Sequence, residues 1–192
     1  MTLNKKFHKL LEKYNLNTKE NWETVFKKMA EYIFQNCHLE ANGTKYYLTE
    51  IEFYYYHKIE HPDLWCYRKP EKNGMFPSDS LWFHYSGMDI TFDNRKNNES
   101  GGILIRSIKD EKGNPTNGPL RSLYALLNTN SNDKSVCLKL ISSESKEKIS
   151  INQTTRYGLN VQTGDKNFSE KNKYQARKYR FYLEGADIKE NK

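Results

Sequence analysis

The segment from Lys45 to His57 constrains the fold more than any other part of the chain. It reads KYYLTEIEFYYYH and is dense in aromatic and β-branched residues, which is typical of a β-strand. Because side chains alternate across a strand, Glu50 and Glu52 are expected on one face. The same alternation adds four more side chains to that face: Tyr46, Leu48, Tyr54 and Tyr56.

Two paired glutamates among aromatic side chains have two interpretations. A carboxylate that faces aromatic rings loses hydration, so its pKa rises, and this suits a general acid or base. Alternatively the face is open to solvent, in which case the glutamates are solvated and the tyrosines lie on the surface. The sequence leaves both interpretations open.

The rest of the chain predicts an α+β protein in which an antiparallel sheet dominates and helices lie at its margins. Apolar residues at helical spacing predict helices over residues 7–14 and 22–34, and Gly118-Pro119 predicts the start of a third. Further strands are predicted at residues 81–85, 89–93, 102–108, 136–141 and 179–183.

Composition narrows the class of protein. A length of 192 residues with 14% aromatics predicts one folded domain and excludes global disorder. The sequence has no apolar run long enough to span a membrane and no leader-like start, so a cytoplasmic protein without a membrane partner is expected. The three cysteines, which include no CxxC pair, argue against a disulfide framework and favour a reducing compartment.

The formal charge of +7 is concentrated toward both ends of the chain. Basic ends around a less basic middle suit a polyanion, although a lysine-rich genome would produce a similar bias. Residues 166–180 interleave aromatics with six cations, a pattern that suits phosphate contacts with stacking. The alternative is an ordinary solvated loop before a strand. The candidate contacts in this segment are Lys173, Arg177, Lys178 and Arg180.

Other common chemistries have little support in the sequence. His57, His61 and Cys66 could suggest a metal site. The spacing of His57 and His61 suits a metal on a helix, but here the pair follows a strand and no fourth ligand stands out, so no metal is predicted. The chain contains no phosphate-binding glycine loop and no GxSxG nucleophile turn. Phosphate-loop nucleotide chemistry and esterase chemistry are therefore not expected.

Taken in order, several segments resemble the alkyladenine (3-methyladenine) DNA glycosylase family, whose signature strand reads ETEAY. Here Thr49–Tyr54 reads TEIEFY and keeps both glutamates and the tyrosine. The similarity covers about residues 25 to 187. The other matching segments are KNGMF at 72–76, LWFHYSGM at 81–88, ILIRSI at 103–108, GP at 118–119, RYGL at 156–159 and RFYLEG at 180–185.

The resemblance implies a single domain with a curved antiparallel sheet, similar to the C-terminal domain of methionyl-tRNA formyltransferases. It places a glycosylase-like domain at residues 21–187, preceded by a helical appendage at 1–20 and followed by a polar tail at 188–192. The expected partner is DNA, either a duplex with a damaged base or a single strand, and the expected state is a monomer. The implied reaction is removal of an alkylated or deaminated purine by hydrolysis of the N-glycosidic bond after base flipping, without a metal or organic cofactor.

The resemblance also assigns roles to residues. Glu52 corresponds to the general base that activates water, and Arg106 to an arginine near the DNA. The side chains expected in the base pocket are Glu50, Tyr54, His61, Phe83, Tyr85 and Asp93. Two departures concern duplex wedging and lesion choice: Ser86 replaces a bulky wedge, and Asp93 falls where the family has asparagine. They keep a second hypothesis open, a non-catalytic module that binds nucleic acid or a nucleotide, and a host–phage conflict protein on the same fold is a further alternative.

Overall fold

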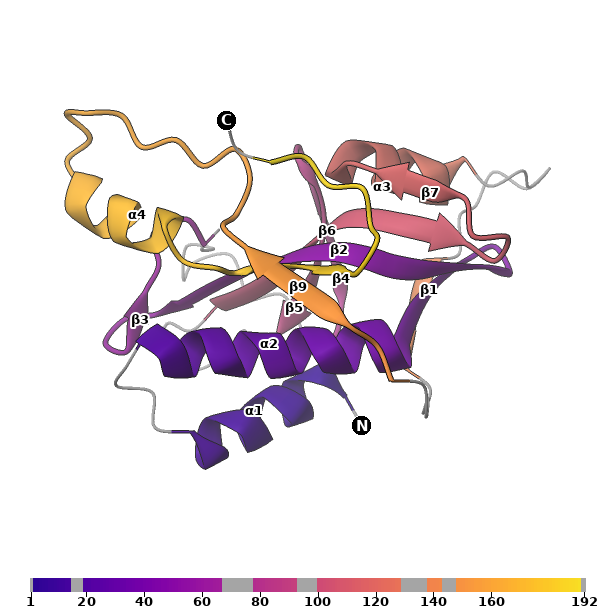
Figure 1. The fold of residues 1–192 in the computed structure, drawn as a ribbon, viewed down its shortest axis with the longest axis horizontal. Coiled ribbons are helices and arrows are strands. Elements are labelled where there is room, and N and C mark those ends of the chain that lie inside the picture. Colours follow the sequence, from indigo (N-terminus) through magenta and orange to yellow (C-terminus); the bar gives the residue numbers. More distant parts are fainter. Residues whose placement is uncertain are drawn as a thin grey trace.

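The computed structural model describes residues 2–14, 19–66, 78–92, 100–128, 138–142 and 148–190. Asp93, the KNGMF segment and Cys137 lie outside these ranges. The described part forms one α+β domain, a curled antiparallel sheet with helices packed around it (Figure 1). The predicted α+β class is therefore confirmed.

The strands within the described ranges join into one sheet, in which every pairing is antiparallel. The longest strand, β2, lies at its centre and pairs with β6, β1, β10 and β3. The main order is β4-β5-β6-β2-β1-β8, while β9 joins through β10 and β7 through β6. The strands are β1 Cys37–Ala41, β2 Thr44–His57, β3 His61–Pro62, β4 Leu81–His84, β5 Gly87–Phe92, β6 Ser100–Asp110, β7 Pro115–Asn117, β8 Leu138–Ser142, β9 Ile151–Thr154 and β10 Arg180–Leu183.

Two helices cover one face of the sheet and close the hydrophobic core. They are α1, Leu3–Lys13, and α2, Lys19–Asn36, which run side by side in Figure 1. Phe26 of α2 stacks on Phe53 of β2 at 4.9 Å between ring centroids. Phe7 of α1 meets Tyr55 and Phe92 edge-on at 5.1 and 4.8 Å. The N-terminal helix thus packs into the same core as the central strand.

The other two described helices pack elsewhere around the sheet, and each contributes to the core, one through Leu123 and Leu126 and the other through Tyr174. The helix α3, Pro119–Leu127, lies on the side of the sheet away from α1 and α2 (Figure 1). It begins with proline at its first position, as the sequence predicted. The helix α4, Phe168–Gln175, lies in the basic segment that the sequence left as either a phosphate-binding segment or a solvated loop.

The register between β2 and β6 shifts twice, between Leu48 and Glu50 and again between Glu50 and Ile51. The first shift is an extra residue in β2, and the second is an extra residue in β6. Each of these bulges reverses the alternation of side chains between the two faces of its own strand. Leu48 consequently belongs to the hydrophobic core with Ile51 and Ile105. The expectation that Leu48 shares the face of the two glutamates is wrong, because the bulge in β2 falls between Leu48 and Glu50.

Candidate functional site

Glu52 lies in a row of side chains that crosses the sheet on the face opposite the core. In the strand register it is opposite Leu104 of β6 on one side and Arg180 of β10 on the other. Leu104 is in turn opposite Asp89, and Asp89 is opposite Trp82. Residues directly opposite each other in antiparallel strands point to the same face. One polar face therefore carries all of these residues.

Glu50 is buried and binds two arginines. Its Oε1 accepts from Nε of Arg106 at 2.7 Å and from Nε of Arg180 at 2.6 Å, while its Oε2 accepts from the hydroxyl of Ser107 at 2.8 Å. Arg106 and Ser107 are consecutive, and a regular strand would send them to opposite faces. The bulge in β6 lets both side chains reach the same carboxylate.

Glu52 has no exposed surface, and each of its oxygens has a donor. Oε1 accepts from the backbone N–H of Tyr157 at 2.7 Å and lies 3.2 Å from Nη1 of Arg106. Oε2 accepts from the hydroxyl of Tyr54 at 2.9 Å. Burial and the adjacent Glu52 raise the pKa of Tyr54 well above its usual value, so this hydroxyl remains a donor. The site holds Glu52 in a fixed orientation.

The two arginines and the two glutamates form a neutral, nearly closed unit, called here the ion cluster (Glu50, Glu52, Arg106, Arg180). Burial acts to lower the pKa of Arg106, but the charges of Glu52 and Glu50 outweigh it and the pKa is raised. Tyr157 covers the cluster, with its ring 5.1 Å from the guanidinium of Arg106 and 5.5 Å from that of Arg180. The half-buried Tyr157 thus separates the cluster from solvent.

A third buried arginine supports the cluster from beside Tyr54. Arg156 donates from Nη1 to Asp63 at 2.6 Å and from Nη2 to the carbonyl of Tyr174 at 2.9 Å. Its guanidinium lies 4.6 Å from the centre of the Tyr54 ring. Arg156 and Tyr157 are consecutive, so one short segment packs against Tyr54 with one residue and covers the ion cluster with the next.

A second polar group occupies the same face on the β4–β5 hairpin. Nε2 of His84 lies 3.2 Å from Oδ1 of Asp89, and Nδ1 lies 3.1 Å from Oγ of Ser86. The backbone N–H of Ser86 also donates to Nδ1, at 3.3 Å. Nδ1 is therefore an acceptor, and the ring proton sits on Nε2 and is donated to Asp89. Burial raises the pKa of Asp89, and the hydrogen bond from His84 acts against that rise.

The structure separates the aromatic residues expected in a base pocket. Phe83 is opposite Met88, a core residue, so it lies on the other face of the sheet from Glu52 and is 48% exposed. Tyr85 sits in the hairpin turn and is 88% exposed. The residue of β4 that shares the face of Glu52 is Trp82, whose ring packs against His84 at 4.8 Å. The alternation of side chains along the strand, counted back from Gly87, could have identified Trp82 from the sequence.

His61 is a core histidine in this structure. It is 1% exposed, its Nδ1 is 2.8 Å from the carbonyl of Tyr55, and its Nε2 is 2.9 Å from the hydroxyl of Tyr179. Aromatic rings of Trp22 and Tyr174 lie within 4.8 Å of its ring centre. Its expected role of stacking on a flipped base does not fit this placement, because its ring is already enclosed.

The predicted nucleic-acid contacts fall into two groups. Arg106 and Arg180 are buried and donate to the glutamates, so they do not meet phosphates at the surface as expected. Lys173 and Lys178 are exposed, and Arg177 is partly exposed with its guanidinium 5.7 Å from the Tyr174 ring. Of the predicted contacts, this second group, on and after α4, is the one available to a polyanion.

Several features bear on cofactors and compartment. Within the described ranges no group of three or more His, Cys, Asp or Glu side chains is placed to hold a metal ion. Cys37 and Cys66 are buried, and neither forms a disulfide. None of the helices in the described residues is long and apolar enough to cross a membrane.

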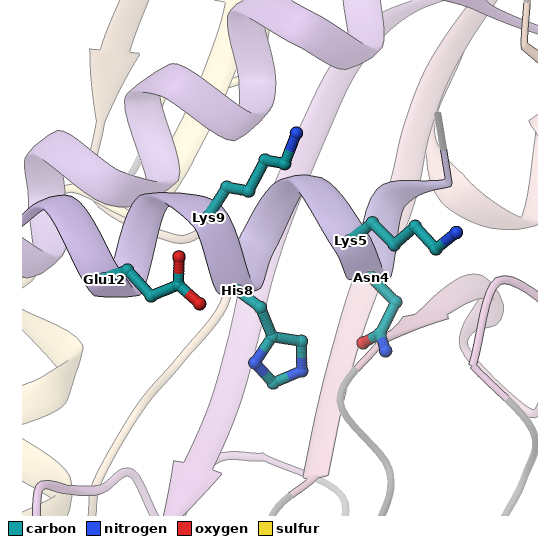
Figure 2. Close-up of a pocket in the computed structure, with 5 residues that line it drawn as sticks. All are labelled: Asn4, Lys5, His8, Lys9 and Glu12. Carbon is teal, nitrogen blue, oxygen red and sulfur yellow. The ribbon is translucent and has the colours of Figure 1, made fainter.

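A surface hollow lies elsewhere, along the outer side of α1 (Figure 2). The residues that line it are Asn4, Lys5, His8, Lys9 and Glu12. All of them belong to that one helix. The hollow is separate from the ion cluster, because α1 covers the core face of the sheet.

Comparison with known proteins finds a distant viral relative and no family. No family model matches the chain. A protein of Acanthamoeba polyphaga mimivirus, described only as uncharacterized, is 31% identical over 128 residues. The match covers 55% of this chain and 57% of the viral protein, so the chain spans little more than half the length of that relative.

Proposed function

We propose that the protein is a DNA glycosylase that removes a damaged purine by hydrolysis of the N-glycosidic bond. The observation that carries the proposal is that segments far apart in the sequence meet in one buried ion cluster. Four segments of the glycosylase-like pattern contribute to one cluster: the strand with Glu50 and Glu52, the strand with Arg106, the segment with Tyr157 and the strand with Arg180. The curled antiparallel sheet also agrees with the formyltransferase-like fold that the resemblance implies.

In the proposed reaction Glu52 takes a proton from water while the bond between the sugar and the base lengthens. Its negative charge also stabilises the positive charge that develops on the sugar, as in glycoside hydrolysis. The hydrogen bonds from Tyr54 and Tyr157 and the nearby Arg106 fix the carboxylate. A fixed carboxylate needs no reorganisation as the transition state forms.

Substrate entry requires one local movement. Glu52 is fully buried, and the backbone N–H of Tyr157 occupies Oε1. Displacement of the half-buried Tyr157 opens Oε1 to water and exposes the cluster to the flipped nucleotide. Hydrogen bonds in a free enzyme often rearrange on binding, so the closed geometry is compatible with catalysis.

The test is excision from labelled duplexes that contain hypoxanthine, ethenoadenine or alkylated purines, at low and high salt. Wild type is expected to release a base, whereas Glu52→Gln is expected to lose release and to keep its fold. Glu184→Gln, on an exposed residue, serves as the matched control and should behave as wild type. Normal excision by a well-folded Glu52→Gln variant would contradict the proposed role of Glu52.

A second function, a non-catalytic module for single-stranded nucleic acid or nucleotides, is favoured by one specific observation. Every oxygen of the two glutamates already has a protein donor, which is also what a purely structural ion cluster would show. A flat or single-stranded ligand needs no wedge, which is consistent with the small Ser86. Salt-sensitive binding without base release from any duplex would support this function.

A further inference from the structure

We infer that Asp89 is the acid that protonates the departing base, oriented by His84, on the side of the site opposite Glu52. This inference rests on the proposed glycosylase function and adds a second catalytic group to it. Three features of the molecule support it: the sheet register, the hydrogen bonds of the β4–β5 hairpin and the burial of the Asp89 carboxyl group.

The register sets the separation of Asp89 and Glu52. They lie in one row on one face, with Leu104 between them, so two strand spacings, about 10 Å, separate their Cα atoms. Glycoside hydrolases that place a base and an acid on opposite sides of a sugar hold the two carboxyl groups about 6.5–9.5 Å apart, a separation within reach of two side chains that project from one face with their Cα atoms about 10 Å apart. Leu104, an apolar side chain that is 7% exposed, lies between the two carboxyl groups in the row.

The hydrogen bonds decide which oxygen of Asp89 carries the transferable proton. Oδ1 accepts from Nε2–H of His84, so a proton on the carboxyl group sits on Oδ2. Oδ2 lies over Gly102, where an added Cβ would be only 2.6 Å away. Gly102 is opposite Tyr54 in the register. Because Gly102 has no side chain, Oδ2 packs against the backbone there, on the side of Tyr54, whose hydroxyl donates to Glu52.

Burial makes the charged form of Asp89 less favourable. Asp89 is 7% exposed, and burial raises the pKa of its carboxyl group. Ser86 completes the orientation, because its backbone N–H donates to Nδ1 of His84 and fixes the tautomer that donates to Asp89. His84 is therefore a positioning residue, and Asp89 is the group that meets the reacting atoms.

Atoms and charges balance over the complete step. The water oxygen bonds to C1′ of the sugar, and Glu52 takes one proton from that water. The C1′–N bond breaks, its electron pair passes to the purine, and the proton on Oδ2 of Asp89 is transferred to a ring nitrogen of the purine. The products are an abasic sugar with a hydroxyl at C1′ and a neutral purine. Solvent then returns one proton to Asp89 and removes one from Glu52.

The dependence on the leaving group tests this assignment. Hypoxanthine needs a proton to leave, whereas 7-methylguanine is already cationic in the nucleotide and leaves without one. Single-turnover excision of both bases is compared in wild type, Glu52→Gln, Asp89→Asn and His84→Gln. Asp89→Asn is expected to slow hypoxanthine release about 100-fold, as loss of a general acid does, and 7-methylguanine release less than about threefold. Glu52→Gln should lose both.

A second variant keeps the test decisive if Asp89→Asn folds poorly. His84→Gln lies on a more exposed side chain, and about a tenfold loss confined to hypoxanthine is expected, since this substitution leaves the carboxyl group in place. His57→Gln, a histidine at the end of β2, is the matched control. Equal losses for the two bases, or no loss, would overturn the role of Asp89 alone. Release of neither base by wild type would overturn both proposals.

Discussion

Glu50 illustrates how single residues hold this protein together. It is 3% exposed, and its carboxylate binds Nε of both Arg106 and Arg180. Burying a charge is unfavourable unless it is paired and hydrogen-bonded, and each partner left alone retains its desolvation penalty. Glu50 therefore matters less for the attraction it provides than for the two buried cations that it neutralises.

The variant Glu50→Ala is expected to lower the free energy of unfolding by about 3–5 kcal/mol, because it leaves the two arginines without the carboxylate that they share. Urea denaturation followed by circular dichroism measures the change. Glu184→Ala, on an exposed side chain, should change the same quantity by less than about 0.5 kcal/mol. Similar effects of the two variants would show that the arginines find other partners.

His61 should make stability depend on pH. Burial lowers its pKa to about 4, while an unfolded chain has the usual value near 6.5. Between these values the unfolded state binds more protons, so the stabilisation present at pH 7 diminishes as the pH falls toward 4. Urea midpoints at pH 7 and at about pH 4.5 should differ more for wild type than for His61→Gln. An unchanged difference in the variant would exclude His61 as the source.

The paired bulges of β2 and β6 determine what the strands present at the site. Without them Arg106 and Ser107 would face opposite sides of the sheet, and Glu50 would lose one of its donors. They also return Leu48 to the core. The bulges thus allow one continuous strand to supply an apolar core on one face and a charged cluster on the other.

Much of this arrangement follows from the sequence, and the remainder depends on strand register. Hydrophobic periodicity correctly predicts α1 and α2. The density of aromatic and β-branched residues predicts β2, and alternation along it places Glu50 and Glu52 together. The short β1 and β9 and the polar α4 carry too little periodic signal to be predicted. The burial of Arg180 could not be foreseen, because it depends on the pairing of β10 with β2, and the sequence does not show which distant strands pair.

At the scale of elements, α1 is expected to be essential to the core. Phe7 has no exposed surface, so Phe7→Ala should lower the free energy of unfolding by about 3–5 kcal/mol through reduced apolar burial and a cavity against Tyr55 and Phe92. Lys9→Ala, on the exposed side of the same helix, is the control and should have little effect. A small effect of Phe7→Ala in urea denaturation would show that α1 is dispensable.

In the molecule as a whole, the paired charges of the ion cluster are buried, and the basic residues around α4 lie at the surface. The buried acids and arginines of the ion cluster neutralise one another. A polyanion would therefore meet the exposed lysines first, and the cluster would contribute little to the field outside.

The salt dependence of DNA binding tests whether the exposed lysines around α4 contact the phosphates. The double variant Lys173→Ala/Lys178→Ala is expected to weaken binding to duplex DNA. It should also reduce the slope of log affinity against log salt by about 0.9 for each phosphate that the protein no longer neutralises. Fluorescence anisotropy over a salt series gives the slope. Lys112→Ala, in the turn after β6, is the control. An unchanged slope in the double variant would place the nucleic-acid surface elsewhere.

The wide sequence separation within the ion cluster has a consequence for synthesis on the ribosome. Glu50 and its partner Arg180 are 130 positions apart, so the glutamate leaves the exit tunnel long before its second cation exists. A nascent chain that ends before β10 has both acids but only Arg106 beside them, and burial of that uncompensated charge is unfavourable. We therefore expect the domain to close only after Arg180 has been synthesised.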